Sequence, residues 1–374
     1  MRIEFGDLRL DERVEKHFQD ILKTNIVSGG PKVKEFEEKW GRIFDYKYNV
    51  AMSSGTSADI AACMTLYDFG AKRGDEIIVP ALAFAAAGNS VLAAGFKPVF
   101  VDIERETLNI NPSLIEEKIN SRTKAIMVVH TMGKPCNMKS ISDISKKYNL
   151  RVIEDCCEAY GAEYNGKFVG NFGDVATFSY YVAHLISCGD GGMASTNNVE
   201  IFDILRSVKS HGRHPDSIYF DHPRFGLNFR MNALVASVGL PQIDDFWEIF
   251  KKRKNNLYYL LDKTKDLEEF AFFNSEEKYE IISPHAFSIT LKDPKYNAKK
   301  FYKFLEDNSV SCKRNFGSMP TQHKAFEFLG HKLGEFPEAE YVGENGLHFG
   351  VHQYLSKDDL DYVLELLHNY FKKV

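Results

Sequence analysis

The sequence is poor in cysteine and has no strong excess of charge of either sign. Six cysteines are spread over 374 residues without a Cys-x-x-Cys pair, at positions 63, 136, 156, 157, 188 and 312. This spacing excludes the common zinc and iron–sulfur motifs, so no metal site is expected, and it favours reduced thiols in a cytoplasm. Because the formal net charge is only −5, a nucleic-acid partner is not expected either.

Long apolar runs are also missing. No stretch approaches about 18 uninterrupted apolar residues, so neither a transmembrane helix nor a membrane partner is expected. The first residues, Met1 to Asp7, contain no apolar segment of the kind that a secretory signal needs. Hydrophobic residues make up 44% and charged residues 26% of the chain, which are the proportions of a globular protein and exclude a mainly disordered one.

The first 245 residues alternate short apolar runs with helical patterns. About seven such runs predict strands, a common number for the sheet of an α/β enzyme, at 48–53, 76–80, 98–102, 125–130, 150–155, 175–180 and 192–196. Strands separated by helices predict a mainly parallel sheet that is covered on both faces.

After about residue 245 the pattern changes to that of a smaller α+β unit. Residues 246–264 predict a long basic amphipathic helix, and the run 251–254 is expected to lie on its solvated face. A strand at 285–291 and helices at 298–307 and 357–373 follow. The sequence therefore predicts a large domain over 1–245 and a small one over 246–374.

Polar clusters follow several of the predicted strands, at the edge where parallel sheets bind their ligands. Gly55 and Thr56 lie in a run of small hydroxyl residues that opens a helix, where free backbone N–H groups can hold a phosphate. Asp155 ends a buried strand, where a carboxylate is costly unless a positive group meets it. Taken singly, these residues are more simply explained as a helix cap and a surface carboxylate.

Two further clusters lie in the next part of the chain. Ser179 ends a strand and His184 follows it shortly afterwards, and the turn 189–192 has the sequence Gly-Asp-Gly-Gly. Together with Asp155 and the hydroxyl-rich turn, these residues predict one phosphate-bearing heteroaromatic ligand whose ring nitrogen pairs with the carboxylate. That ligand is pyridoxal phosphate, whose protonated ring acts as an electron sink.

In this order the segments resemble the DegT/DnrJ/EryC1/StrS sugar aminotransferase family, which has the aspartate aminotransferase (type I) fold. The resemblance covers nearly the whole chain, and its ordered set of motifs is highly specific, although each motif alone is weak. The matching segments begin at Ser54, Gly74, Lys97, Val152, Gly173, Gly189, Ser210 and Gly226.

His184 is the main departure from this family. Family aminotransferases carry a lysine five residues after the strand-ending serine, where it binds the cofactor covalently, and here that place holds His184. Imidazole cannot form that Schiff base. The same replacement is found in a branch of the family, the sugar 3-dehydratases. Glu158, three residues after Asp155, and the segment 345–353 also resemble this branch.

The resemblance implies a dehydratase that uses pyridoxamine phosphate, held without a covalent bond. It would remove the C3 hydroxyl of a nucleotide-linked, GDP-type 4-keto-6-deoxy sugar, with His184 as the base, for the synthesis of dideoxysugars in surface polysaccharides. L-Glutamate would regenerate the pyridoxamine form. An imidazole suits this role because its unperturbed pKa of about 6.5 lies near neutral pH.

The resemblance also implies roles for individual residues. Gly55, Thr56 and Ser179 would bind the phosphate, Phe84 would stack on the ring, and Glu158 would contact the ring hydroxyl. Asn228 would reach the phosphate of the neighbouring subunit, which requires a homodimer with shared active sites. Candidates for substrate contact are His211, His348 and His352.

Two other readings of the sequence stay open. The chain could be a nucleotide-sugar aminotransferase whose lysine has been replaced by histidine, or a non-catalytic member of the family that binds pyridoxal phosphate. The retention of Asp155, Ser179 and Glu158 argues against loss of catalysis.

Overall fold

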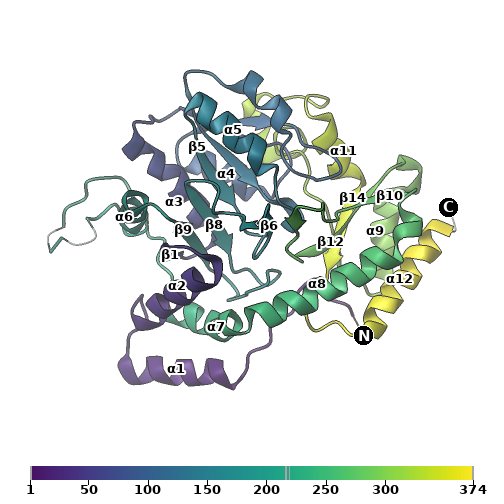
Figure 1. The fold of residues 1–374 in the computed structure, drawn as a ribbon, viewed down its shortest axis with the longest axis horizontal. Helices are drawn as coiled ribbons and strands as arrows, with labels where there is room; N and C mark the ends of the chain where they lie inside the picture. Colours follow the sequence, from purple (N-terminus) through teal and green to yellow (C-terminus); the bar gives the residue numbers. More distant parts are fainter. Residues whose placement is uncertain (1, 215–216, 219, 373–374) are drawn as a thin grey trace.

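The structure, a computed structural model, describes residues 2–214, 217–218 and 220–372. Its centre is a seven-stranded sheet with helices on both sides (Figure 1). In spatial order the strands are β1 (Tyr48–Met52), β9 (Gly192–Thr196), β8 (Val175–Ser179), β5 (Arg151–Asp155), β4 (Thr123–Val129), β2 (Glu76–Pro80) and β3 (Lys97–Val101). Strand β9 runs antiparallel to both its neighbours while the others run parallel to one another, which confirms the predicted mainly parallel sheet.

Alternate side chains of each strand enter two different hydrophobic cores. Ile77 and Val79 of β2 pack on one face of the sheet and Ile78 packs on the other. Covering the first face are α3 (Gly55–Thr65), α4 (Ala86–Ala93) and α6 (Val199–Val208); α2 (Pro31–Phe44), α5 (Met138–Tyr148) and α7 (Ala233–Asp244) cover the second. Burial on both faces explains why these strands are continuous apolar runs and do not alternate with polar residues.

A second sheet lies beside the first and is antiparallel throughout. Its spatial order is β10 (Ala271–Phe273), β12 (Ala286–Leu291), β14 (Gly346–Gly350) and β13 (Cys312–Arg314). Two helices cover it, α9 (Ala298–Asp307) and α12 (Lys357–Lys372). The division of the chain into domains at residue 245 stays a prediction.

Helix α8 (Phe246–Lys263) connects the two sheets (Figure 1). Phe246 and Phe250 at its start belong to the core of the large sheet, whereas Leu257 and Leu260 belong to the core of the small one. A single rigid helix that is buried at both ends fixes the distance between the two sheets.

The remaining elements are short or peripheral. Helix α1 (Glu12–Thr24) packs on α7, and a three-stranded ribbon consists of β11 (Glu280–Ile281), β6 (Glu163–Tyr164) and β7 (Lys167–Phe168). Helices α10 (Met319–Gln322) and α11 (Pro337–Asn345) precede β14. Across the described ranges, no helix combines the length and the apolar character that a bilayer crossing demands.

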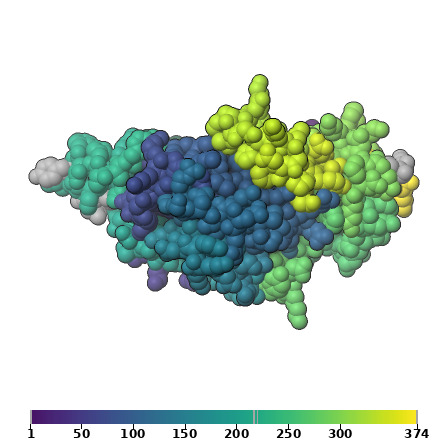
Figure 2. All heavy atoms as spheres, turned by 90° about the horizontal axis from the view of Figure 1, so that it is seen from above, coloured from purple at the N-terminus to yellow at the C-terminus, as the bar shows by residue number. Residues whose placement is uncertain are grey.

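Between α6 and α7 the chain forms an arm, which we define as residues 209–214, 217–218 and 220–232. The arm reaches away from the body at the end opposite to α12 (Figure 1), and the view from above shows the same teal segment at one extremity (Figure 2). Large apolar side chains on the arm are exposed to solvent, namely those of Ile218, Phe220, Phe225 and Leu227.

Candidate active site

The carboxyl ends of β1, β5 and β8 meet at one edge of the large sheet. A Cβ added to Gly55 would lie 2.5 Å from the Cβ of Ser179 and 3.2 Å from the Sγ of Cys157. Three segments that are far apart in the sequence are therefore in van der Waals contact here, and only a residue without a side chain fits between the other two.

The turn before α3 exposes backbone donors. Ser54 caps the helix, because its Oγ accepts the N–H of Ser57 at 3.0 Å while Ser57 Oγ accepts the N–H of Ser54 at 2.9 Å. This capping box satisfies part of the first turn and leaves the N–H groups of Gly55 and Thr56 without an acceptor within the helix. A helix N-terminus of this kind attracts an anion.

Asp155 lies at the end of β5 and is buried. One carboxylate oxygen, Oδ1, accepts the N–H of Cys157 at 3.0 Å, but no cationic side chain within the described residues forms an ion pair with this carboxylate. Burial raises the pKa of Asp155, while the Cys157 hydrogen bonds and the nearby His130 lower it. A positive group brought into the site would stabilise the ionised carboxylate.

A second buried carboxyl group, on Asp59 of α3, faces Asp155, and no motif in the sequence marks it. Its Oδ1 accepts the hydroxyl of Thr177 at 2.5 Å, and its Oδ2 has no hydrogen-bond partner. Oxygen atoms of Asp59 and Asp155 and the Sγ of Cys157 lie within 4.8 Å of one another. Burial and the Asp155 carboxylate raise the pKa of Asp59 well above its usual value, which favours the neutral form of Asp59.

His184 lies in the turn that follows β8. Its Nδ1 is sealed from solvent without a hydrogen-bond partner, and its ring centroid is 6.1 Å from that of Tyr160. Burial, with Arg253 and Lys313 nearby, lowers the pKa of His184 to about 3. The imidazole is therefore neutral at physiological pH, which is the protonation state that a base requires.

Arg253 of α8 holds the backbone of this turn. Its guanidinium donates to the carbonyl oxygens of Ala183 at 3.4 Å and His184 at 3.2 Å, and its Nε donates to Gln353 Oε1 at 2.8 Å. The basic run 251–254 was expected on the solvated face of its helix, but the Arg253 side chain is buried. The reason is tertiary, since only the docked turn supplies the carbonyl acceptors that this guanidinium needs.

Glu158 and His285 complete the cluster. Oε2 of Glu158 accepts the N–H of Met132 at 2.7 Å, and its Oε1 lies 3.5 Å from Nε2 of His285. Burial raises the pKa of Glu158 to about 8. The ring of His285 lies 5.2 Å from that of His184, centroid to centroid. His285 precedes β12 of the small sheet, and no motif in the sequence marks it.

Comparison with known proteins agrees with this geometry. Residues 9–368 match the DegT/DnrJ/EryC1/StrS aminotransferase family. The chain belongs to this family. It is 33% identical over 358 residues to the GDP-perosamine synthase of Escherichia coli O157:H7. The matched region covers 93% of this chain and 92% of that protein.

A dehydratase is among the family relatives. The chain is 30% identical over 383 residues to GDP-4-keto-6-deoxy-D-mannose 3-dehydratase of Escherichia coli O55:H7, with 96% of this chain and 97% of the relative covered. A solved structure of the E. coli enzyme with bound hydrated PLP is similar at a TM-score of 0.88 and 28% identity, over 98% of this chain and 99% of that one. The fold of this family member is the type I aminotransferase fold, and its cofactor is pyridoxal phosphate.

The residues present fit this cofactor. Asp155 is a buried carboxylate that lacks a cation, the α3 N-terminus offers N–H donors to a phosphate, and Gly55 lets this N-terminus approach Ser179 closely. Phe84, between β2 and α4, has a 65% exposed side chain that touches Phe316 at a centroid distance of 6.0 Å. It presents an uncovered ring face at the same edge of the sheet.

The other sequence-predicted residues are placed as follows. Asn228 and His211 are exposed on the arm, where Asn228 Oδ1 accepts from Arg230 Nε at 3.1 Å and the His211 carbonyl lies 3.0 Å from Nδ1 of His222. His348 of β14 is buried, and its Nδ1 pairs with Asn315 Oδ1 at 2.8 Å. The structure therefore does not bring the arm residues into contact with His184 within one subunit.

His352 differs from His348 in having no partner. Both of its ring nitrogens are buried without a hydrogen bond, and burial lowers its pKa to about 4. Burial also lowers the pKa of His348 to about 3. Both histidines are neutral at physiological pH.

Glu154, next to Asp155, has a structural function. It accepts the N–H groups of Gly170 at 2.7 Å and Phe172 at 2.8 Å, and Nε2 of His130 lies 3.1 Å away. Because Nδ1 of His130 accepts the N–H of Cys136 at 3.0 Å, its Nε2 carries the proton and donates to Glu154. His130, Glu154 and Cys156 have metal-ligand atoms within 4.8 Å of one another, but these hydrogen bonds already engage the histidine and the carboxylate.

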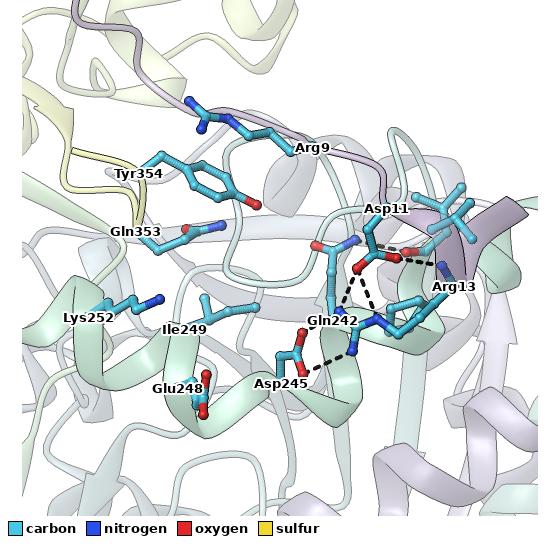
Figure 3. A pocket seen from close by; sticks show the side chains of 13 residues that line it. Arg9, Asp11, Arg13, Gln242, Asp245, Glu248, Ile249, Lys252, Gln353 and Tyr354 are labelled. Atoms are coloured by element: carbon cyan, nitrogen blue, oxygen red, sulfur yellow. Dashed lines mark hydrogen bonds and ion pairs between the residues drawn. The ribbon is translucent and has the colours of Figure 1, made fainter. Parts of the chain in front are cut away.

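A cavity of about 150 Å³ lies away from this cluster, between the N-terminal segment and the α7–α8 junction (Figure 3). None of the sequence-predicted site residues lines it. Its charged groups pair with each other, since Arg13 contacts Asp11 at 2.6 Å and Asp245 at 2.5 Å. Figure 3 also shows Arg9 beside Tyr354, where the guanidinium lies 4.2 Å from the ring centroid. The cavity therefore lies between packed structural elements, and the ion pairs of Arg13 close one side of it.

Proposed function

We propose that this protein is a pyridoxamine phosphate-dependent 3-dehydratase of a GDP-linked 4-keto-6-deoxy sugar. The observation that carries this proposal is His184, a neutral imidazole at the position where the family aminotransferases have their cofactor-binding lysine. A group that moves protons but cannot bind the cofactor covalently suits elimination with a diffusible pyridoxamine form.

Different residues of the protein bind the cofactor and transfer protons in this reaction. The N–H groups of Gly55 and Thr56 and the hydroxyl of Ser179 bind the cofactor phosphate, Phe84 stacks on the ring, and Asp155 keeps the ring nitrogen protonated. When bound, the cofactor supplies an amine for the C4 ketone and an electron sink. With the cofactor bound, Nε2 of His184 would move a proton from the cofactor's 4′ carbon to the departing C3 hydroxyl, which would leave as water.

L-Glutamate restores the pyridoxamine form, with His184 again moving the proton. The arm supports a homodimer with shared active sites, because its exposed apolar side chains require a partner surface. In that dimer Asn228 would reach the phosphate of the neighbouring site, and His211, His348 and His352 are candidates for sugar contact.

The decisive experiment is mass spectrometry of the product formed from GDP-4-keto-6-deoxymannose and glutamate. We expect a product that has lost the C3 oxygen and gained no nitrogen, together with one ammonia and one 2-oxoglutarate. An amino sugar that retains the C3 hydroxyl would overturn the proposal.

Amination is the second candidate, because GDP-perosamine synthases are among the relatives at up to 33% identity over nearly the whole chain. That reaction would need another amine to take the place of the missing lysine. Lys313 of β13 is a candidate for this amine, because its Nζ lies 5.9 Å from the ring of Tyr181, three residues before His184.

We predict that borohydride treatment of the cofactor-loaded protein leaves no cofactor on the chain after denaturation. Reduction fixes a Schiff base irreversibly, and imidazole cannot form one. Peptide mass spectrometry across residues 180–190 and around Lys313 is the measurement. A pyridoxyl group on Lys313 would favour the aminotransferase reading, and a lysine-containing family aminotransferase is the positive control.

A further inference from the structure

His285 and Glu158 form a buried chain of groups that leads to His184. Nε2 of His285 lies 3.5 Å from Oε1 of Glu158. On its other side the ring of His285 lies 5.2 Å from that of His184, with a 34° angle between the ring planes. Glu158 follows β5 of the large sheet and His285 precedes β12 of the small one. The three side chains therefore span the junction between the two sheets.

The imidazoles of His184 and His285 each have one ring nitrogen that is sealed from water and makes no hydrogen bond. Nδ1 of His184 and Nδ1 of His285 are each buried without a partner. The two Nδ1 atoms therefore make no hydrogen bond to each other in this structure. Since a buried polar atom without a partner is costly, a small rotation of the two neighbouring rings that places one proton between these atoms would satisfy both. No such need exists for His348, whose Nδ1 already pairs with Asn315 at 2.8 Å.

The charges around His285 oppose protonation of either ring. Arg253 of α8, Lys313 of β13 and the imidazoles of His184 and His348 face it, and together with burial they hold the pKa of His285 well below its usual value. Among the residues that the structure describes, Glu158 is the acidic group that forms an ion pair with His285. A proton that enters this cluster therefore has a single favourable destination, the Glu158 carboxylate.

We propose that His285 is a positioning residue that connects the base His184 to Glu158 and disperses the positive charge that His184 acquires. This rests on the proposed role of His184 as the base. As Nε2 of His184 gains a proton, the two rings turn towards each other and the Nδ1 proton of His184 passes to Nδ1 of His285. The Nε2 proton of His285 then passes to the ionised carboxylate of Glu158, and the sequence reverses when His184 gives its proton up.

This arrangement makes the base step depend on the ionisation of Glu158. Burial and the Asp155 carboxylate raise the pKa of Glu158 to about 8, so Glu158 is mostly protonated, and cannot accept, at pH 7. As the pH rises through about 8, Glu158 ionises and the base step accelerates. The direction of this dependence is opposite to that of a group that acts as a proton donor.

The test compares His285→Phe with the wild type in the half-reaction with glutamate, followed through the cofactor absorbance between about pH 6 and 10. Phenylalanine keeps the ring that packs against Phe5 and His184 but carries no proton. We expect the wild-type rate to rise with pH, and the variant to lack this rise and to be at least about tenfold slower at the alkaline end. Glu158→Gln should behave in the same way, and the double variant should lose no more than either single one.

A readout without turnover uses the infrared band of protonated carboxyl groups in the cofactor-free protein. The band that Glu158→Gln removes should titrate near pH 8 in the wild type and at higher pH in His285→Phe, because the ionised carboxylate loses the imidazole that lies 3.5 Å from it. The matched control is His331→Phe, which removes a surface histidine 2.7 Å from Glu335 and should change neither measurement.

Two results would overturn the proposal: a pH profile of His285→Phe parallel to that of the wild type, or a carboxyl band that titrates identically in both. Because family aminotransferases and dehydratases both carry out the half-reaction with glutamate, these results do not depend on the sugar product. A sugar assay that yields an amino sugar while His285→Phe behaves as expected would reject the dehydratase proposal alone.

Discussion

Replacing Asp155 with asparagine is expected to slow elimination by about 10²–10³-fold while the protein stays folded. Asparagine is nearly isosteric and can still accept the N–H of Cys157, which the carboxylate now accepts at 3.0 Å. The asparagine side chain carries no charge, so the ring nitrogen of the cofactor loses the ion pair that keeps it protonated. The measurement is single-turnover elimination with preloaded pyridoxamine phosphate, alongside a thermal melt.

Asp59→Asn is the matched control for this prediction. Asp59 is also a buried carboxyl group, but burial and the Asp155 carboxylate favour its neutral form, so removing its capacity to ionise should change the rate by less than about tenfold. A folded Asp155→Asn protein that retains more than about a tenth of the wild-type rate, a barrier change under roughly 1.4 kcal/mol, would show that Asp155 is not the partner of the ring nitrogen.

Replacing His184 with lysine is expected to convert the reaction from dehydration towards transamination. The amine restores the covalent link to the cofactor that family aminotransferases use, and it removes the neutral imidazole from the site. General base catalysis typically contributes about 10²–10⁴-fold, so the yield of deoxygenated sugar should fall by at least about a hundredfold as an amino sugar appears. Product mass spectrometry and borohydride trapping at residue 184 are the measurements.

His184→Asn separates the two effects of that substitution. It removes the base without adding an amine, so elimination should fall as in His184→Lys but no amino sugar and no trapped cofactor should form. A lysine variant that dehydrates at the wild-type rate would show that His184 does not decide between the two reactions.

Several features of the site were predictable because they depend on short stretches of sequence. The strand patterns predicted the mainly parallel sheet, since strands buried on both faces are continuously apolar. The segments around Gly55, Asp155 and Ser179 are local strand–turn units, and the topology of an α/β sheet brings the carboxyl ends of its strands to one edge. His184 could be singled out because its distance from Ser179 is fixed along the chain.

Other features depend on contacts between distant segments. Asp59 meets Asp155 only because α3 packs against the sheet, and its position in an apolar helix suggested nothing about a partner. Arg253 lies in a basic run that resembles a solvated helix face, yet its guanidinium is buried against the turn that carries His184.

What the sequence determined by itself was therefore the fold class, the cofactor and the replacement of the lysine, all of which follow from local pattern and fixed spacing. What the tertiary structure decided was which groups surround His184. His285 is about a hundred residues away along the chain and comes close because the 130–134 loop and the segment before β12 pack tightly, so that a Cβ on Gly133 would lie 2.1 Å from the carbonyl oxygen of Ser283. Neither partner of such a contact carries a local signal, because burial and proximity arise only when the two sheets dock.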